Sequence, residues 1–320
     1  MPAIEQCREQ LPRGYHARPM SLDDLERRLR AATDCDAWIA ALAEFFAARG
    51  LFFGHGTDNA TDEAFWLLRH LQEWRDVDFQ APPAAELVPQ ALAIAARRVE
   101  ERLPLAYLIN EAWFAGLRFF VDERVLVPRS PLAEVIEREF APWCALAPGD
   151  CVLDIGTGSG CIAIAAAHYC PEAQIDATDC SAAALAVAAR NVERHDVGAR
   201  LRLFEADLFP PADRRYRVIV ANPPYVPEDE VATLPPEYRH EPVLGLASGP
   251  TGFAAAERIL AGALERLTPD GVLFLELGAG AEAFAAAHAR LPLIALEFER
   301  GGDGVLVTTA GEIQEFLHRS

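Results

Sequence analysis

Residues 151–160 read Cys-Val-Leu-Asp-Ile-Gly-Thr-Gly-Ser-Gly and indicate an α/β fold. The first five residues form an apolar run that ends at a glycine loop, which predicts a buried strand. A helix is predicted directly after the loop, over 161–169. Glycines at alternate positions let the backbone approach a ligand closely, and the N–H groups at the start of the helix face the same place. The stretch therefore predicts a ligand-binding turn between a strand and a helix.

The glycine pattern alone does not identify the ligand. Counted from Gly156, the dinucleotide pattern Gly-x-Gly-x-x-Gly needs a third glycine where this chain has Cys161. Counted from Gly158, the looser form that ends in alanine is met at Ala163. A dinucleotide-binding fold also carries a glycine loop between its first strand and helix. Such a fold therefore remains possible at this point.

Two further strands are predicted to end in acidic residues. The strand at 174–178 leads to Asp179, where a carboxylate suits the hydroxyl groups of a ribose. The strand at 201–204 leads to Asp207 and Leu208. An acid followed by an apolar residue could bind the amino group of adenine and cover its ring. The alternative is an acidic loop beside core residues.

The stretch 221–226, Ala-Asn-Pro-Pro-Tyr-Val, follows a predicted strand at 217–220. Two prolines remove two backbone donors and favour an extended Asn222, so neither a helix nor a strand continues here. The Asn222 side-chain oxygen and the Pro223 carbonyl could accept both hydrogens of a primary amide. Tyr225 offers an aromatic face for a flat amide or base. The alternative is a strand-terminating turn with a surface tyrosine.

The end of the chain distinguishes between α/β folds. A strand is predicted at 271–277, and strands at 293–298 and 304–308 flank Gly301-Gly302-Asp303. That turn indicates an antiparallel hairpin at the edge of a parallel sheet. Seven strands with the last one reversed resemble a class I methyltransferase more than a six-stranded dinucleotide fold. The Pro-rich and Glu-rich residues 227–250 predict a long functional loop, part of a lid over the site.

Residues 21–105 predict a small helical bundle. Ser21, Asp36 and Thr61 are the predicted N-caps of its first three helices, and a fourth helix follows near residue 92. His55 lies in a glycine-flanked loop, which is typical of a structural or solvated histidine.

Composition excludes several classes of function. All 29 basic residues are arginine, so mechanisms that need a phosphate-loop, Schiff-base or kinase-type lysine are excluded. The net charge of −19 disfavours stable nucleic-acid binding and fits a basic protein partner better. Seven cysteines without a Cys-x-x-Cys pair argue against a zinc ribbon and a disulfide framework, and no metal is predicted. Without a long uncharged apolar run or a leader-like start, no membrane contact and a cytoplasmic location are expected.

In order and spacing, the motifs resemble those of the protein glutamine N5-methyltransferases over nearly the whole chain. The motifs are Asp154 to Gly160, Asp179, Asp207-Leu208 and Asn222-Pro223-Pro224-Tyr225. The last of these is shared with adenine N6-methyltransferases.

Within the family, Val127-Pro128-Arg129-Ser130-Pro131 and residues 54–59 resemble the branch that methylates large-ribosomal-subunit protein three. The release-factor branch typically has Pro-Arg-Pro followed by acidic residues at the first of these places. Two positions depart from the patterns: Thr61 stands where a tryptophan is expected, and Leu208 where the release-factor branch can carry one.

The resemblance implies a site residue by residue. It implies that S-adenosylmethionine is bound by Asp154, Gly156, Thr157, Gly158, Ser159 and Gly160, by Asp179 at the ribose, by Asp207 and Leu208 at the adenine, and near Asn222. It implies catalysis by Asn222, Pro223, Pro224 and Tyr225, with Asn222, Pro223, Tyr225 and Arg129 binding the substrate. From the residues alone, Arg129 could equally be a solvated linker residue.

The resemblance also divides the chain. It implies a helical substrate-recognition domain at 21–105, a bridging β-hairpin and linker at 106–131, and a methyltransferase catalytic domain at 132–320. Residues 1–20, which are rich in Arg, Pro and Gln without a period, are expected to form a flexible tail.

The primary hypothesis is methylation of a glutamine side-chain nitrogen in large-ribosomal-subunit protein three, with S-adenosylhomocysteine as the other product. The same reaction on peptide chain release factors is the alternative. An adenine N6-methyltransferase is a lower one, because it needs a basic groove. A nicotinamide-dependent oxidoreductase and a donor-binding module without catalysis are opposed by the reversed strand and by Asn222 and Tyr225, respectively.

Overall fold

The computed structural model describes residues 20–211 and 214–318. All but the last residue of the tail predicted at 1–20 lies outside this range. The chain divides into two compact units. The helical unit falls within Met1–Leu51 and Asn59–Glu101, and the α/β unit comprises Phe52–Asp58 and Arg102–Ser320. The loop 52–58 therefore belongs to the α/β unit, although it follows helices of the other unit in sequence.

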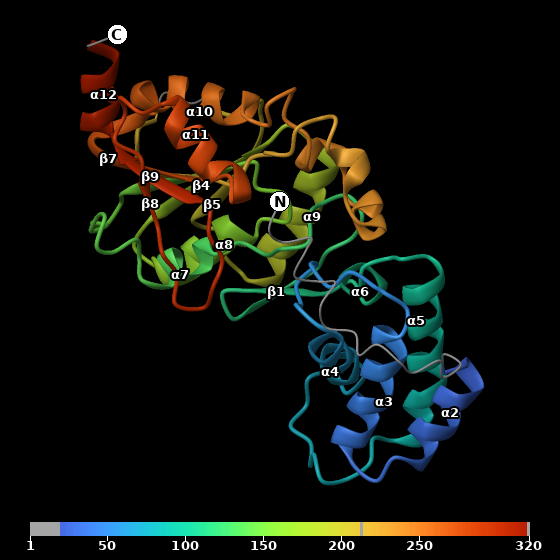
Figure 1. Cartoon of the computed structure of the whole chain (residues 1–320). Helices are drawn as coiled ribbons and strands as arrows, with labels where there is room; N and C mark the ends of the chain where they lie inside the picture. Colours follow the sequence, from blue (N-terminus) through green and yellow to red (C-terminus); the bar gives the residue numbers. More distant parts are fainter. Residues whose placement is uncertain (1–19, 212–213, 319–320) are drawn as a thin grey trace. The chain divides into compact units, whose positions relative to one another are not determined.

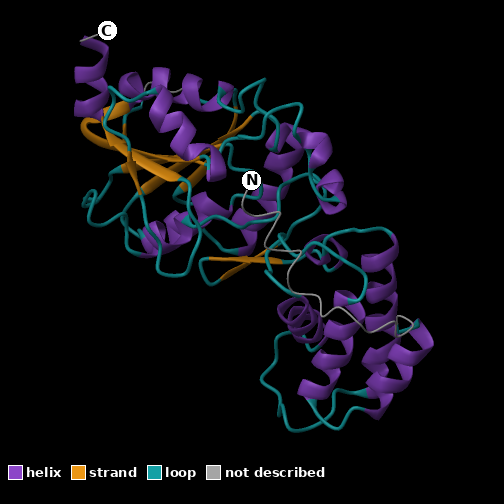
Figure 2. Cartoon of the chain, in the orientation of Figure 1, coloured by secondary structure: helices purple, strands orange, loops and turns teal. Residues whose placement is uncertain are grey.

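The helical unit contains the four predicted helices (Figures 1 and 2). These are α2 Leu22–Ala31, α3 Cys35–Ala47, α4 Ala60–Leu71 and α5 Val88–Glu100, the last preceded by the 3-10 turn η1 Ala85–Leu87. Apolar side chains at helical spacing, such as Leu25, Leu42 and Leu67, are fully buried between them. Burial of each such side chain is worth roughly 1.5–3 kcal/mol, which holds this small unit together.

One of the three predicted caps is confirmed and two are wrong. Ser21 caps α2 and forms a capping box with Asp24. The cap of α3 is Asp34 instead of Asp36, and the cap of α4 is Asn59 instead of Thr61. A cap residue needs extended backbone, which Asp34 and Asn59 have with φ near −157° and −158°, whereas the predicted residues lie inside the first helical turn.

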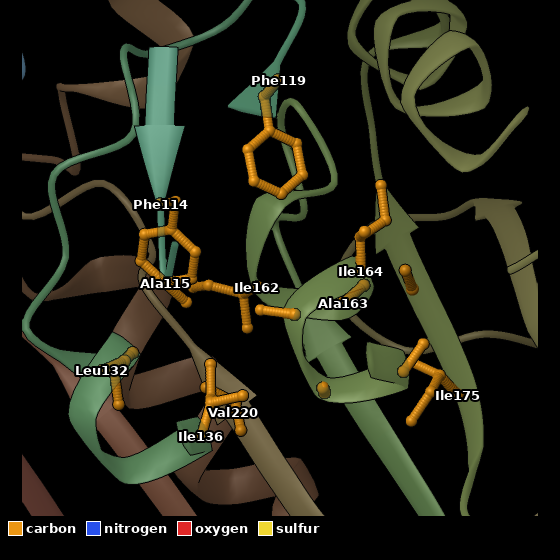
Figure 3. Packing of buried hydrophobic residues seen from close by; sticks show 14 of the residues in the cluster. Phe114, Ala115, Phe119, Leu132, Ile136, Ile162, Ala163, Ile164, Ile175 and Val220 are labelled. Atoms are coloured by element: carbon orange, nitrogen blue, oxygen red, sulfur yellow. The ribbon is translucent and has the colours of Figure 1, made fainter. Parts of the chain in front are cut away.

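The α/β unit begins with a short hairpin. Helix α6 Leu105–Leu108 leads to β1 Ala112–Phe114 and β2 Leu117–Phe119, which pair antiparallel around Ala115 and Gly116. The predicted hairpin is confirmed but shorter than expected, because residues 105–108 are helical and residues 125–127 form no strand. Phe114 and Phe119 pack into the same core as helix α7 Leu132–Glu137, as Figure 3 shows.

Seven strands form the main sheet, in the order β5-β4-β3-β6-β7-β9-β8. They are β3 Cys151–Ile155, β4 Gln174–Asp179, β5 Leu201–Glu205, β6 Tyr216–Ala221, β7 Leu267–Glu276, β8 Ile294–Ala295 and β9 Val305–Thr309. Strands β3 to β7 pair in parallel, whereas β9 is antiparallel to both of its neighbours. The predicted class I methyltransferase sheet with its reversed last strand is confirmed.

Helices cover both faces of this sheet (Figure 1). Helices α7, α8 Cys161–Tyr169 and α9 Ala182–Arg194 pack on one face, and α10 Ala254–Arg266, α11 Ala281–Ala287 and α12 Ala310–His318 on the other. Consecutive residues of β6 point to opposite cores: Val220 meets the α7 and α8 side, and Ile219 meets the α10 side. This two-sided burial explains the continuous apolar strands in the sequence.

The strand order creates one switch point. The chain runs outward from β3 through β4 to β5 and then returns to place β6 on the other side of β3. Ile155 and Ala221, the last residues of β3 and β6, are paired in register. The glycine loop after one strand and Asn222 after the other therefore start side by side. Open α/β sheets bind their ligands at such a point.

In the part of the chain that the structure describes, no helix is both long and apolar enough to cross a bilayer.

Candidate active site

A cavity of about 510 Å³ opens at the carboxyl ends of the central strands. Its lining includes twelve of the residues predicted from the sequence: Arg129, Gly156, Thr157, Gly158, Ser159, Asp179, Asp207, Leu208, Asn222, Pro223, Pro224 and Tyr225. Asp154 and Gly160 are absent from this lining. A cavity of this volume is typical of a small-molecule site. Among residues 20–211 and 214–318, no group of three or more His, Cys, Asp or Glu side chains could hold a metal.

The glycine loop is hydrogen-bonded to the end of the neighbouring strand β4. Gly156 and Thr157 donate their backbone N–H groups to the Thr178 carbonyl, each at 2.9 Å. Asp179 accepts the Gly158 N–H at 2.9 Å through one carboxylate oxygen. Gly156 has a φ of 74°, a left-handed conformation that favours glycine. The loop thus presents backbone to the cavity while its position is fixed by the neighbouring strand.

Asp154 lies under the loop and is 1% exposed. Its Oδ2 accepts the Thr157 hydroxyl at 2.6 Å and the Ala163 N–H at 3.2 Å. Its Oδ1 is buried and has no hydrogen-bond partner among the described residues. Burial raises the pKa of Asp154 to about 7, against the lowering effect of these two hydrogen bonds. A buried acceptor without a partner fits a positively charged or hydrogen-bonding ligand group beside this loop.

Gly160 acts through packing. It caps α8 with a φ of 81°, and a Cβ there would lie 3.2 Å from Ile164 and 3.3 Å from Ala188. A side chain there would crowd Ile164 and Ala188 and would be strained by the left-handed backbone.

Asp207 and Leu208 form the wall beyond β5. Leu208 has a φ of 72°, which is uncommon for a residue with a side chain, and Thr178 donates a 2.6 Å hydrogen bond to its carbonyl. Asp207 is exposed and pairs with Arg258 of α10 at 2.7 Å. The sequence did not predict this partner, which lies 51 residues away.

Asn222 to Tyr225 leave β6 directly into the cavity. In the described part of the chain, the Pro223 carbonyl oxygen accepts no hydrogen bond, so it remains available to a ligand. The Tyr225 ring packs where Gly278 has no side chain: a Cβ on Gly278 would lie 3.0 Å from the ring. Burial, followed by the charge of Glu276, raises the pKa of Tyr225 to about 12, so the phenol stays neutral.

Arg129 lines the cavity and is not a solvated linker residue. Its side chain is 25% exposed and forms a two-point ion pair with Glu241, at 2.6 Å for Nη2 to Oε2. Its Nη1 also donates to the Val127 carbonyl at 3.1 Å. The guanidinium lies 5.4 Å from the centre of the Tyr238 ring.

Glu241 was missed from the sequence, although it organises this wall. In addition to its ion pair with Arg129, Glu241 accepts the Val127 N–H at 3.0 Å. His55 Nε2 lies 3.6 Å from Glu241 Oε2. The centre of the His55 ring lies 4.6 Å from the centre of the Tyr238 ring, and the two rings are tilted by 57°. Burial alone would raise the pKa of Glu241. Arg129 and then His55 outweigh this effect and lower the pKa to about 2. His55 thus has a structural role behind the cavity lining, where it contacts Glu241 and Tyr238.

Glu276 was also missed. It is the last residue of β7, is 4% exposed and lines the cavity. Ser130 donates its hydroxyl to the Glu276 carboxylate. Burial raises the pKa of Glu276 to about 7, while Ser130, Arg129 and Asn222 lower it. A charged residue that ends the apolar run Val-Leu-Phe-Leu was the signal in the sequence.

The segment 227–250 forms part of the cavity wall, with Leu234 and Tyr238 among the lining residues. It contains three 3-10 turns: η2 Val231–Thr233, η3 Pro236–His240 and η4 Val243–Gly245. Glu237, fully buried, accepts the Phe52 N–H at 3.0 Å and pairs with Arg102 at 3.1 Å. Both partners are first residues of the α/β unit where the chain enters it.

Residues 143–234 match the family model described as "Methyltransferase small domain". A solved structure of a methyltransferase from Pyrococcus furiosus is similar over 61% of this chain and 90% of that chain, at 20% identity and a TM-score of 0.45.

Two curated relatives carry the name ribosomal protein uL3 glutamine methyltransferase. The proteins of Neisseria meningitidis serogroup B and Neisseria gonorrhoeae are each 45% identical over 267 residues. The alignments cover 81% of this chain, and 87% and 88% of the relatives, respectively. Identity at this level over most of both chains establishes common family membership. The chain therefore belongs to the family of ribosomal protein uL3 glutamine methyltransferases.

Proposed function

We propose that the protein methylates the side-chain nitrogen of a glutamine in ribosomal protein uL3, the large-subunit protein three, with S-adenosylmethionine as the methyl donor. The observation that carries this proposal is the acceptor pair of Asn222 and Pro223, which lines the same cavity as the glycine loop. The two relatives described above support the substrate, since uL3 is named in theirs.

The cavity lining, and Asp154 beneath its glycine loop, fit the donor. Gly156 and Gly158 present backbone without side chains, and the buried Asp154 Oδ1 is an acceptor without a partner in the described structure. Asp179 stands at the end of β4, where a ribose is expected. When bound, S-adenosylmethionine supplies an electrophilic methyl group and leaves as S-adenosylhomocysteine.

The protein's task is to present a poor nucleophile. An amide nitrogen shares its lone pair with the carbonyl. The Asn222 oxygen and the Pro223 carbonyl can each accept one N–H of the substrate amide, which fixes its plane and favours positive charge on nitrogen as the N–C bond forms. The nitrogen then gives up one proton to solvent. Orientation can contribute ~7–11 kcal/mol, whereas one preorganised polar contact contributes ~2.7–4 kcal/mol. Positioning is therefore the main contribution.

The net charge of the whole chain fits a basic protein substrate. The net charge of −19 favours a basic polypeptide over a nucleic acid, and no stable nucleic-acid or membrane binding is proposed. We assign substrate recognition to the helical unit and substrate contact at the cavity to Arg129, Pro223 and Tyr225. A ribosomal-protein substrate agrees with the cytoplasmic location expected from the sequence.

The decisive test is methyl transfer to purified uL3. The protein, uL3 and isotopically labelled S-adenosylmethionine are incubated, and the modified residue is located by tandem mass spectrometry. We expect one labelled glutamine in uL3 and none in a release factor or in ribosomal RNA incubated in parallel. Label in the release factor alone, or in RNA alone, would overturn the assignment.

A further inference from the structure

Glu276 lies beside Asn222 because of the strand register. Ala221 of β6 pairs in parallel with Leu275 of β7, so the next residues, Asn222 and Glu276, continue the two strands at the same level. Side chains at equal levels of neighbouring strands point to the same face and meet. The sheet therefore brings a buried carboxylate against the amide that is proposed to bind the substrate.

The other neighbours of Glu276 are donors. The Ser130 hydroxyl accepts the Leu132 N–H at 3.1 Å, so its single hydrogen is directed to the Glu276 carboxylate. The hydroxyl of Ser130, the positive charge of Arg129 and the neighbouring Asn222 side chain all favour the ionised form of Glu276. An ionised carboxylate has no hydrogen to donate. It can therefore face only the NH2 group of Asn222 and repels the amide oxygen.

We propose that ionised Glu276 is a positioning residue: it holds the Asn222 NH2 group, so that the Asn222 oxygen is turned toward the substrate amide. This inference rests on the proposed glutamine methylation. It explains why a carboxylate is buried at the end of an apolar strand where a leucine would fit the pattern. An asparagine without this partner could present either its oxygen or its NH2 group, and the NH2 group would repel the substrate hydrogens.

The arrangement depends on pH. A protonated Glu276 carries an O–H group that can donate to the Asn222 side-chain oxygen. This oxygen is then no longer available to accept an N–H of the substrate amide. Burial raises the pKa of Glu276 to about 7, so this competition begins as the pH falls below neutrality. The other titratable groups near it are Arg129, Tyr225 and Cys161. Burial raises the pKa of both Tyr225 and Cys161 to about 12, and Arg129 remains charged, so none of them titrates near pH 7.

The test compares the pH dependence of kcat in the wild type and in Glu276→Gln, at saturating donor and uL3. We expect the wild-type kcat to fall on the acidic side of about pH 7. In Glu276→Gln we expect kcat to be roughly 10- to 100-fold lower at pH 8 and independent of pH in this range, because a glutamine can offer Asn222 either an acceptor or a donor. KM and the donor Kd should stay within about threefold.

Two further variants distinguish positioning from mere structural support. Ser130→Ala should move the acidic limb to higher pH, because Ser130 lowers the pKa of Glu276. Glu134→Gln, which removes another buried carboxylate of the α/β unit, should lower stability and leave kcat and its pH profile unchanged, since Glu134 binds the backbone of residues 299 and 300. An unaltered kcat and acidic limb in Glu276→Gln would overturn the inference, whereas a wild type that methylates no glutamine would overturn the proposed function instead.

Discussion

The guanidinium of Arg129 and the carboxylate of Glu241, 112 residues apart in sequence, form a two-point ion pair in the wall of the cavity. The Glu241 side chain is fully buried, and Arg129 is its strongest partner. The pair joins the turn before α7 to the segment after η3. It thereby ties Arg129, which lines the cavity, to the segment 227–250, which forms another part of the cavity wall.

We predict that this pair is energetically coupled. Arg129→Ala should lower the free energy of unfolding by about 3 kcal/mol, because it leaves a buried carboxylate without its main partner. The double variant with Glu241→Ala should lose less than the sum of the two single variants. Urea denaturation of the four proteins measures the coupling. Strict additivity would show that the pair contributes no mutual stabilisation.

Glu241 also predicts an acid sensitivity. Its pKa is lowered from 4.5 to about 2, so its ionised form stabilises the fold above pH 4.5, and this contribution is lost as the pH falls from 4.5 towards 2. The shift corresponds to about 3 kcal/mol at 1.36 kcal/mol per pKa unit. The difference in unfolding free energy between wild type and Glu241→Gln should therefore shrink over this range. A constant difference would contradict the assignment.

Asn222→Asp should separate binding from catalysis. The aspartate would stand beside Glu276, and two adjacent carboxylates cannot both ionise easily, so one becomes a donor that repels the substrate amide. We expect kcat to fall by roughly 10²–10³-fold or more, by analogy with the loss of one preorganised contact. Calorimetry should show S-adenosylmethionine binding within about tenfold of wild type. Near-normal turnover would rule out the amide-clamp mechanism.

Asp154 predicts that donor binding depends on pH. The raised pKa of about 7 means that much of the free protein carries a protonated Asp154 below neutrality. If a cationic donor favours the ionised form, affinity should rise up to about pH 7, level off above it and be accompanied by proton release below it. Calorimetry in two buffers with different ionisation enthalpies measures the number of protons that are released when the donor binds. Asp154→Asn should abolish this dependence, and a wild type without it would exclude Asp154 from donor binding.

Gly278→Ala tests whether the Tyr225 ring must keep its place. Both Gly278, with φ of 49°, and Gly301, with φ of 83°, are left-handed, so alanine costs about 1–2 kcal/mol of stability at either position. Only at position 278 would the new methyl group press on the Tyr225 ring, because nothing lies within 4 Å at position 301. We therefore expect a roughly tenfold lower kcat for Gly278→Ala alone. Equal kcat values would show that the ring position is unimportant.

The sequence predicted what local patterns determine. The strand ends at Asp179 and Asn222 and the glycine loop follow from short apolar runs and their terminators, and the structure brings them to one cavity. It could not predict partners across long separations, such as Glu276 with Ser130, 146 residues apart. Such pairs depend on the strand order and register of the sheet. The residues around one position in the sequence do not determine either. The cap errors at Asp36 and Thr61 have a local cause, since each of these regions contains several residues, close together, that can cap a helix.

The loop 52–58 has a consequence for how this protein can be divided. The chain passes between its two units after Leu51, after Asp58 and after Glu101, so neither unit is a continuous piece of sequence. Deleting residues 1–101 would remove Phe52 and His55 and leave the buried carboxylates of Glu237 and Glu241 with fewer partners. A helical unit attached in this way cannot be exchanged by one recombination event. Any chimaera with a relative must carry the seven-residue loop along with the α/β unit to which it belongs.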